Sequence, residues 1–114
     1  MTSTNVIELE CRDNFVILRF NRPHVHNAIN EEVMTQWEAH MDKIEADSKI
    51  RAIIVTGKGE KSFCAGGDLK YFASLKNKKT CMEMLNRMQA LINRLNMMGK
   101  FVVAAINGQA LGGG

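Results

Sequence analysis

Two short stretches of this chain are rich in glycine and could use their backbone for chemistry. The first, Phe63-Cys64-Ala65-Gly66-Gly67-Asp68-Leu69-Lys70, follows an apolar run at 52–55, and the second, Ala110-Leu111-Gly112-Gly113-Gly114, follows another at 101–106. Glycine lets a ligand come close to the backbone, where an amide N–H without an internal partner can donate a hydrogen bond. Two converging donors of this kind would bind an anion or an oxyanion.

Three other patterns in the chain do not predict a nucleotide, metal or disulfide site. The sequence Gly-Lys-Gly-Glu at 57–60 lacks the remaining residues of either common nucleotide-binding loop, so we interpret it as a surface turn. His24 and His26 have the spacing of a metal pair, but no cysteine or carboxylate cluster accompanies them, so we predict no metal site. The three cysteines contain no Cys-x-x-C pair, which indicates reduced thiols that serve as small apolar residues.

Hydrophobic periodicity predicts the elements that would position the glycine stretches. Two early strands are expected at 7–11 and 15–18, joined near Arg12-Asp13-Asn14, and a helix should begin after Asn30 and end near Ser48. The later elements predicted are a strand at 52–56, a helix from about Thr80 to Met98 that stops at Gly99, and a strand at 101–106 buried on both faces. Trp37 and Cys64 are expected in the core.

This order of elements describes an α/β fold in which the later strands are parallel. The carboxyl ends of parallel neighbours lie on one edge of a sheet, where ligands of open α/β sheets bind. The loops that follow Val55 and Ile106 should therefore meet there, and we predict an oxyanion site between them.

Four motifs together resemble the crotonase family, the enoyl-CoA hydratase/isomerase superfamily. They are Asn21-Arg22-Pro23, Asn27-Ala28, the stretch FCAGGDLK, and the run from Val103 to Gly114. The resemblance covers essentially the whole chain and implies a crotonase-like spiral of ββα turns, the ClpP/crotonase fold. It also implies that residues 1–114 are the N-terminal portion of a single domain, truncated before the catalytic helix.

The resemblance further implies an enzyme that binds acyl-CoA thioesters and stabilises a thioester enolate. Carried over to matching positions, the oxyanion donors are the backbone amides of Gly67 and Gly113. The substrate-binding residues implied are His24, Val25, His26, Ala28, Ala65, Gly66, Gly67, Asp68, Leu69 and Lys70. Coenzyme A is part of the substrate, so no separate cofactor is expected, and the resemblance implies that the protein is a homo-oligomer, a trimer or a hexamer.

The resemblance does not decide which reaction of the family the protein catalyses. The catalytic glutamates of the family's hydratases fall beyond Gly114, so we expect the complete protein to hydrate 2-enoyl-CoA and the 114-residue chain alone to be inactive. The alternatives are a truncated binding or assembly module without chemistry, or an isomerase, hydrolase or decarboxylase of the same family. Asp68 is expected to cap a short helix, and Lys70 is either a contact for CoA phosphates or a solvated surface lysine.

Composition excludes several other classes. Of the 114 residues 46% are apolar, the formal net charge is +3, and lysines and arginines are spread among acidic neighbours, which argues against nucleic-acid binding. No apolar run approaches the roughly 18 residues of a membrane helix, and the N-terminus lacks the layout of a signal peptide. We therefore predict a cytoplasmic protein that does not associate with membranes.

Overall fold

The computed structural model describes residues 5–114, and it begins with the predicted hairpin. Strand β1 (Ile7–Cys11) pairs antiparallel with β2 (Phe15–Phe20) across the turn at residues 12–14. Side chains of β2 alternate between half-buried and buried positions, as expected for a strand with one face in the core. The two early strands are therefore confirmed.

The main sheet has four strands in the order β1-β2-β3-β5. Strand β3 (Ala52–Gly57) runs parallel to β2, and β5 (Phe101–Ala104) runs parallel to β3. The predicted parallel arrangement of the later strands is therefore correct, and the carboxyl ends of β3 and β5 lie at one edge.

Helix α1 (Glu31–Ala46) begins where its capping residue predicts. The Asn30 side chain accepts a hydrogen bond from the Val33 amide at 3.0 Å, and the helix buries Trp37 on its inner face. The Trp37 ring stands edge-on to Phe20 of β2, with the ring centroids 5.7 Å apart. The helix ends at Ala46, two residues before the predicted end, because Asp47 adopts an extended conformation.

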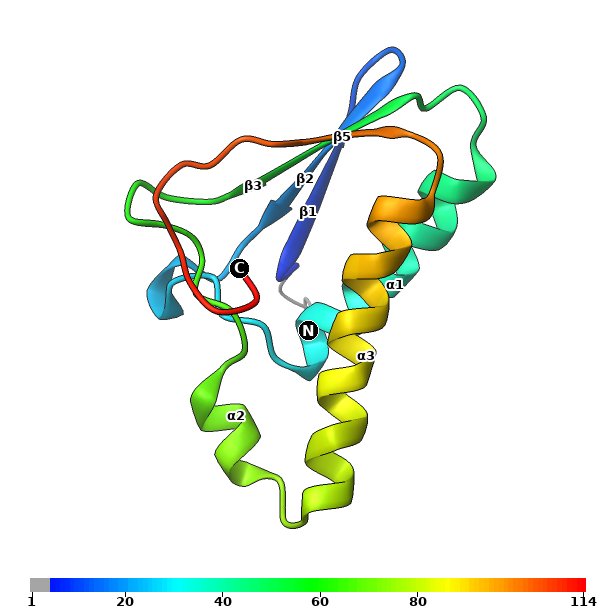
Figure 1. Ribbon diagram of the computed structural model, residues 1–114. Coiled ribbons are helices and arrows are strands. Elements are labelled where there is room, and N and C mark those ends of the chain that lie inside the picture. The colour runs from blue at the N-terminus through cyan, green and yellow to red at the C-terminus, as the bar shows by residue number, and fades with distance from the viewer. Residues whose placement is uncertain (1–4) are drawn as a thin grey trace.

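Helices α2 (Leu69–Ser74) and α3 (Lys78–Met97) form a hairpin that projects from the sheet (Figure 1). Helix α3 begins two residues before the predicted Thr80, because Asn77 caps it by accepting the Thr80 amide at 2.8 Å. It ends at Met97, one residue before the predicted Met98, and the predicted stop residue Gly99 adopts φ +79° just beyond the C-cap. Helix α3 lies beside α1, and an ion pair between Arg94 and Asp42 joins them at 2.7 Å.

A second, two-stranded sheet was not predicted from the sequence. Strand β4 (Ser62–Cys64) pairs in parallel with β6 (Gln109–Ala110), and a short 3-10 turn, η1 (Pro23–Val25), lies near them. Strands of three and two residues are too short to produce an alternating pattern. The first glycine stretch, at 63–70, consequently begins within β4, whereas we expected it to belong to the loop after the strand at 52–56.

The prediction that residues 101–106 form a strand buried on both faces is wrong. Strand β5 ends at Ala104, Phe101 is 79% exposed and Val103 is 54% exposed. In residues 5–114, β5 is an edge strand that pairs only with β3, and Val102 packs against the core while the alternate side chains face outward. After Ala105 the backbone leaves the sheet and turns toward β6.

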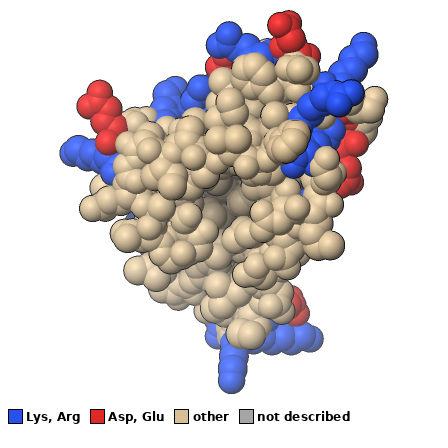
Figure 2. Space-filling view, turned by 45° about the horizontal axis from the view of Figure 1, so that its top comes forward, with Lys and Arg blue, Asp and Glu red and all other residues tan. Residues whose placement is uncertain are grey.

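Charged residues lie mainly at the margins of the face shown in Figure 2, with both signs intermixed, and the centre of that face is hollowed. No basic stripe crosses this face. In the part of the chain that the structure describes, no helix has both the length and the apolar character required to cross a membrane.

Candidate active site

The two glycine-rich loops touch each other, as predicted. The Leu111 amide donates a hydrogen bond to the Cys64 carbonyl at 3.1 Å, which continues the β4–β6 pairing into the loops. Gly66 lies so close to the second loop that a methyl group on its Cα would be 2.7 Å from the Leu111 oxygen and 2.9 Å from the Gly113 nitrogen. Its φ of +86° also excludes most other residues.

The Gly67 amide is oriented by hydrogen bonds on either side of it. The Ile29 amide donates to the Gly66 carbonyl at 2.8 Å, and the Asp68 amide donates to the Ile29 carbonyl at 2.8 Å. In a trans peptide the C=O and the following N–H point in opposite directions. The Gly66 carbonyl points at Ile29, so the Gly67 N–H points away from it, and within residues 5–114 it donates to no protein acceptor.

The Gly113 amide is also exposed and free of a protein acceptor among residues 5–114. It lies in a turn that the Gly114 amide closes by donating to the Leu111 carbonyl at 2.8 Å, with Gly112 at φ +53°. A methyl group on Gly113 would lie 3.2 Å from the terminal methyl of Met88 on α3. The two candidate amides therefore belong to loops in direct contact, and both are available to a ligand.

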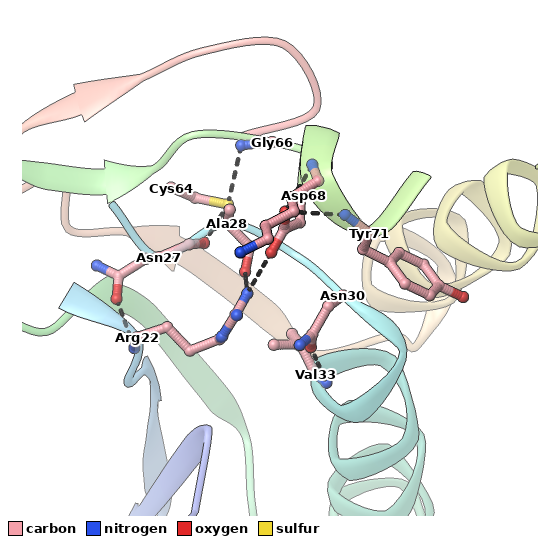
Figure 3. Close-up of polar contacts among 10 residues, drawn as sticks. Arg22, Asn27, Ala28, Asn30, Val33, Cys64, Gly66, Asp68 and Tyr71 are labelled. Carbon is pink, nitrogen blue, oxygen red and sulfur yellow. Dashed lines mark hydrogen bonds and ion pairs between the residues drawn. The ribbon is translucent and has the colours of Figure 1, made fainter. Parts of the chain in front are cut away.

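The loop at residues 22–28 supports the first glycine loop from behind (Figure 3). Asn27 is 1% exposed, its side-chain oxygen accepts from the Arg22 amide at 2.8 Å, and its amide group donates to the Ser62 carbonyl at 3.0 Å. It adopts φ +58°, a conformation that asparagine tolerates better than most residues. The Ala65 amide then donates to the His26 carbonyl at 3.0 Å, so the two loops share a backbone contact.

The Asp68 carboxylate holds two parts of the site together. One oxygen accepts hydrogen bonds from the amides of Lys70 and Tyr71 at the start of α2, which confirms the predicted capping role, and the other lies 3.1 Å from Arg22 Nη1. Burial alone raises the pKa of Asp68. The hydrogen bonds from the Tyr71 amide and the Arg22 guanidinium outweigh that effect and hold the pKa below its ordinary value of 3.8.

Cys64 lies fully buried directly behind the loop. Its thiol donates to the Asn27 carbonyl at 3.3 Å and accepts from the Gly66 amide at 3.5 Å. Burial raises the pKa of this thiol, so it is a neutral packing group and not a nucleophile. Cys64 therefore agrees with its prediction as a small core residue, whereas Cys11, at the end of β1, is exposed.

The structure brings together most, but not all, of the predicted substrate-binding residues. Val25, Ala28, Ala65, Gly66, Gly67 and Asp68 lie in the two adjoining loops described above, and each is half-buried or buried. Leu69 is 84% exposed and Lys70 is exposed, so neither side chain packs against the two loops. His24 belongs to the loop at residues 22–28 but is exposed, and it lines a hollow of about 460 Å³ together with Lys58 and Glu60.

The histidines show no arrangement for a metal. His24 and His26 are exposed, and His26 Nδ1 lies 3.0 Å from the Ser62 hydroxyl. Across residues 5–114 no group of three or more metal-binding side chains comes together. The sequence at 57–60 forms the end of β3 and an exposed bend, as the surface-turn interpretation predicted.

An apolar cavity of about 310 Å³ opens between the sheet, α3 and the turn at residues 113–114. Its walls include Trp37, Val55, Leu95 and Val102. Among residues 5–114, no acidic or basic side chain lines this cavity, so these side chains offer no acid or base to a ligand held at Gly113.

Comparison with known proteins agrees with this geometry. The model of the family described as "Enoyl-CoA hydratase/isomerase" matches residues 10–114. The chain belongs to the enoyl-CoA hydratase/isomerase family. It is 38% identical over 117 residues to the short-chain-enoyl-CoA hydratase of Clostridium acetobutylicum, an alignment that spans 100% of this chain and 43% of that protein.

The chain is also similar to a hydrolase of known sequence and to a hydratase of known structure. The mitochondrial 3-hydroxyisobutyryl-CoA hydrolase of Bos taurus is 33% identical over 100 residues, which covers 86% of this chain and 26% of the hydrolase. The crystal structure of enoyl-CoA hydratase from Bacillus anthracis superposes with a TM-score of 0.91 at 30% identity, over 96% of this chain and 43% of that one. The predicted crotonase-like fold is therefore confirmed, and the chain spans less than half the length of these relatives.

Sequence reasoning on this enoyl-CoA hydratase/isomerase family member missed the roles of three polar residues. Arg22 and Asn27 stood in the motifs that carried the family resemblance, but no contact was predicted for either. Asn107 accepts from the Gly57 amide at 3.0 Å and donates to the Ser62 carbonyl at 3.1 Å, which fixes the approach of β6 to β4. An asparagine directly after an apolar run was the available signal for such a backbone contact.

Proposed function

We propose that the loops of this chain form part of the acyl-CoA thioester site of an enzyme that hydrates 2-enoyl-CoA. The amides of Gly67 and Gly113 donate hydrogen bonds to the thioester carbonyl oxygen. The observation that carries this proposal is the contact between the two loops, which leaves both amides without a competing protein acceptor within residues 5–114.

The chemistry explains why backbone donors suit this reaction. Addition of water to a 2-enoyl thioester passes through an enolate whose negative charge collects on the thioester oxygen. Donors already aimed at that oxygen stabilise the transition state more than the ground state, and removal of one such donor typically costs about 3 kcal/mol. The two hydrogen bonds that orient Gly67 through Ile29 meet this requirement for preorganisation.

Proton transfer requires a different group. Asp68 is the carboxylate next to Gly67, but it is ion-paired with Arg22, caps α2 and has a lowered pKa, so it is a weak base. The described residues therefore contribute binding and oxyanion stabilisation. We propose that acid and base catalysis comes from other residues of the complete enzyme.

The substrate-binding residues follow the same proposal. The backbone of 24–28 and of 65–70 lines the path of coenzyme A, and Lys70, exposed at the start of α2, lies free to contact its phosphates. Coenzyme A enters as part of the substrate, so the proposed reaction requires no further cofactor.

Hydrolysis of an acyl-CoA is the second candidate, favoured by the likeness to 3-hydroxyisobutyryl-CoA hydrolase. Both reactions place negative charge on the thioester oxygen, so the same two amides serve either one. The products distinguish them, because only hydrolysis releases a free CoA thiol.

The test joins these 114 residues to the remaining part of the Bacillus anthracis hydratase and assays the chimera with crotonyl-CoA. Loss of enoyl absorbance without thiol release shows that the two loops support hydration when the hydratase part supplies the acid and base, and thiol release in the same chimera would instead support the hydrolase. A parallel assay of the 114-residue chain alone should give no enzymatic turnover. Turnover by the short chain at the rate of the chimera would show that its own residues supply the acid and base.

A further inference from the structure

Arg22 connects the two loops that flank Gly67. Its Nη1 donates to the Ala28 carbonyl at 2.7 Å and to the Asp68 carboxylate at 3.1 Å, from a single position between the two segments (Figure 3). The side chains of Arg22 and Asp68 are only 13% and 15% exposed. A charged pair this well shielded is strongly disturbed when one partner is removed, because the other remains without compensation.

This contact lies directly beside the hydrogen bonds that orient the Gly67 amide. Ala28 precedes Ile29, and Asp68 follows Gly67, so Arg22 holds together the same two segments that the Ile29–Gly67 bridge pairs. The two Ile29 hydrogen bonds decide where the Gly67 N–H points. Any widening between the segments would lengthen these bonds and turn the donor.

The two oxygens of Asp68 separate this function from helix capping. Oδ1 accepts the amides of Lys70 and Tyr71, whereas Oδ2 faces Arg22. An asparagine at position 68 retains an oxygen for the cap but loses the charge that attracts the guanidinium. The chain therefore allows the ion pair to be removed while α2 keeps its N-cap.

We propose that Arg22 is a positioning residue for the oxyanion site: through Asp68 and Ala28 it holds the Gly67 amide in the direction required to meet a thioester oxygen. This inference rests on the proposed function of Gly67. Arg22 acts through its neighbours and not on the ligand, because the guanidinium nitrogen that faces the loop is occupied by two protein acceptors.

The first test uses the ¹⁵N-labelled chimera and its variant Arg22→Met. We expect faster hydrogen exchange at the Ile29 and Asp68 amides and an order parameter for Gly67 that falls from about 0.85 toward 0.6. Arg19→Met is the matched control, since Arg19 lies on β2, three residues before Arg22, and its ion pairs are with Glu8 and Glu10 of β1. Unchanged exchange and order in Arg22→Met would overturn the inference.

A second variant guards against general unfolding. In Asp68→Asn the exchange of Ile29 should accelerate as in Arg22→Met, while the amides of Lys70 and Tyr71 keep their protection because the cap remains. If the Ile29 amide keeps its protection from hydrogen exchange in both variants, the proposal is contradicted. Arg22→Lys should recover part of the Gly67 order, because an ammonium retains the charge but not the guanidinium geometry.

The kinetics of the chimera separate a positioning role from a general structural one, because a positioning residue should affect kcat and leave KM nearly unchanged. Arg22→Met should lower kcat by roughly tenfold and leave KM within about twofold, less than the roughly 10²–10³-fold loss expected when an oxyanion donor is deleted. If kcat is the same in Arg22→Met and the parent while Gly67→Pro lowers it, only the inference about Arg22 is overturned. If Gly67→Pro also leaves kcat unchanged, the proposed function of Gly67 fails as well.

Discussion

Gly66 and Gly113 lie in backbone contact: a methyl group on the Gly66 Cα would be only 2.9 Å from the Gly113 nitrogen. This approach brings together loops that are separated by more than forty residues of sequence and by the whole of α3. It is possible because neither residue carries a side chain and because Gly66 adopts φ +86°.

Gly66→Ala should therefore destabilise the chain by about 1–3 kcal/mol from backbone strain together with the collision at Leu111 and Gly113. Gly99→Ala is the matched control, since Gly99 has φ +79° but nothing within 4 Å of an added methyl group. Urea unfolding of both variants separates the two contributions. Equal losses in the two variants would mean that the contact between the loops contributes nothing.

Gly67→Pro should abolish most turnover of the chimera, because proline has no N–H to donate. We expect kcat to fall by roughly 10²–10³-fold. Gly67→Ala is the control that keeps the donor, although its methyl group would lie 2.8 Å from the Phe72 ring and require that ring to move. Near-normal kcat in Gly67→Pro would remove this amide from the site, and Asp68→Asn should cost less than the proline variant.

Asp68 should stabilise the fold most at pH values above its ordinary carboxyl range. Its pKa in the folded chain lies below the ordinary value of 3.8, so the folded state favours the ionised form. The contribution is fully present above 3.8 and is lost as the pH falls through the lower, folded-state pKa. The measurement is a carboxyl NMR titration of Asp68, together with unfolding free energies of the parent and Asp68→Asn; a folded-state pKa above 3.8 would contradict the prediction.

The exposed apolar side chains on and near β5 should make the 114-residue chain self-associate. Phe101 is 79% exposed, Val103 is 54% exposed, and the unpaired edge of a sheet favours further pairing. Sedimentation at tens of micromolar, the concentration range at which such surfaces typically aggregate, should show oligomers. Phe101→Ser with Val103→Thr should reduce them; a monomeric parent chain at that concentration is the opposing result.

Several features of the fold were predictable because they depend on local sequence. Asn30 marked the start of α1 and Gly99 the end of α3, since capping residues act within one turn of helix. The meeting of the two glycine loops was predicted from the parallel order of β3 and β5, although the contact itself continues the pairing of β4 with β6.

The rest depends on contacts between distant segments. Strands β4 and β6 pair over two or three residues, which no periodicity can reveal. The exposure of β5 depends on which layers cover it, and a continuous apolar run carries no information about that. The ion pair between Arg22 and Asp68 spans 46 positions, so the residue types were visible in the sequence but their partnership was not.

The most direct test of the central claim is the infrared carbonyl band of butyryl-CoA labelled with ¹³C at the thioester carbon, bound to the chimera. This saturated ligand cannot be hydrated, so the complex persists during the measurement. Hydrogen bonds from Gly67 and Gly113 should shift the bound carbonyl stretch to lower frequency than in free solution, with the shift retained in Gly67→Ala and reduced in Gly67→Pro. A bound carbonyl at the frequency of the free thioester, or one that Gly67→Pro leaves unchanged, would contradict an oxyanion site at these glycines.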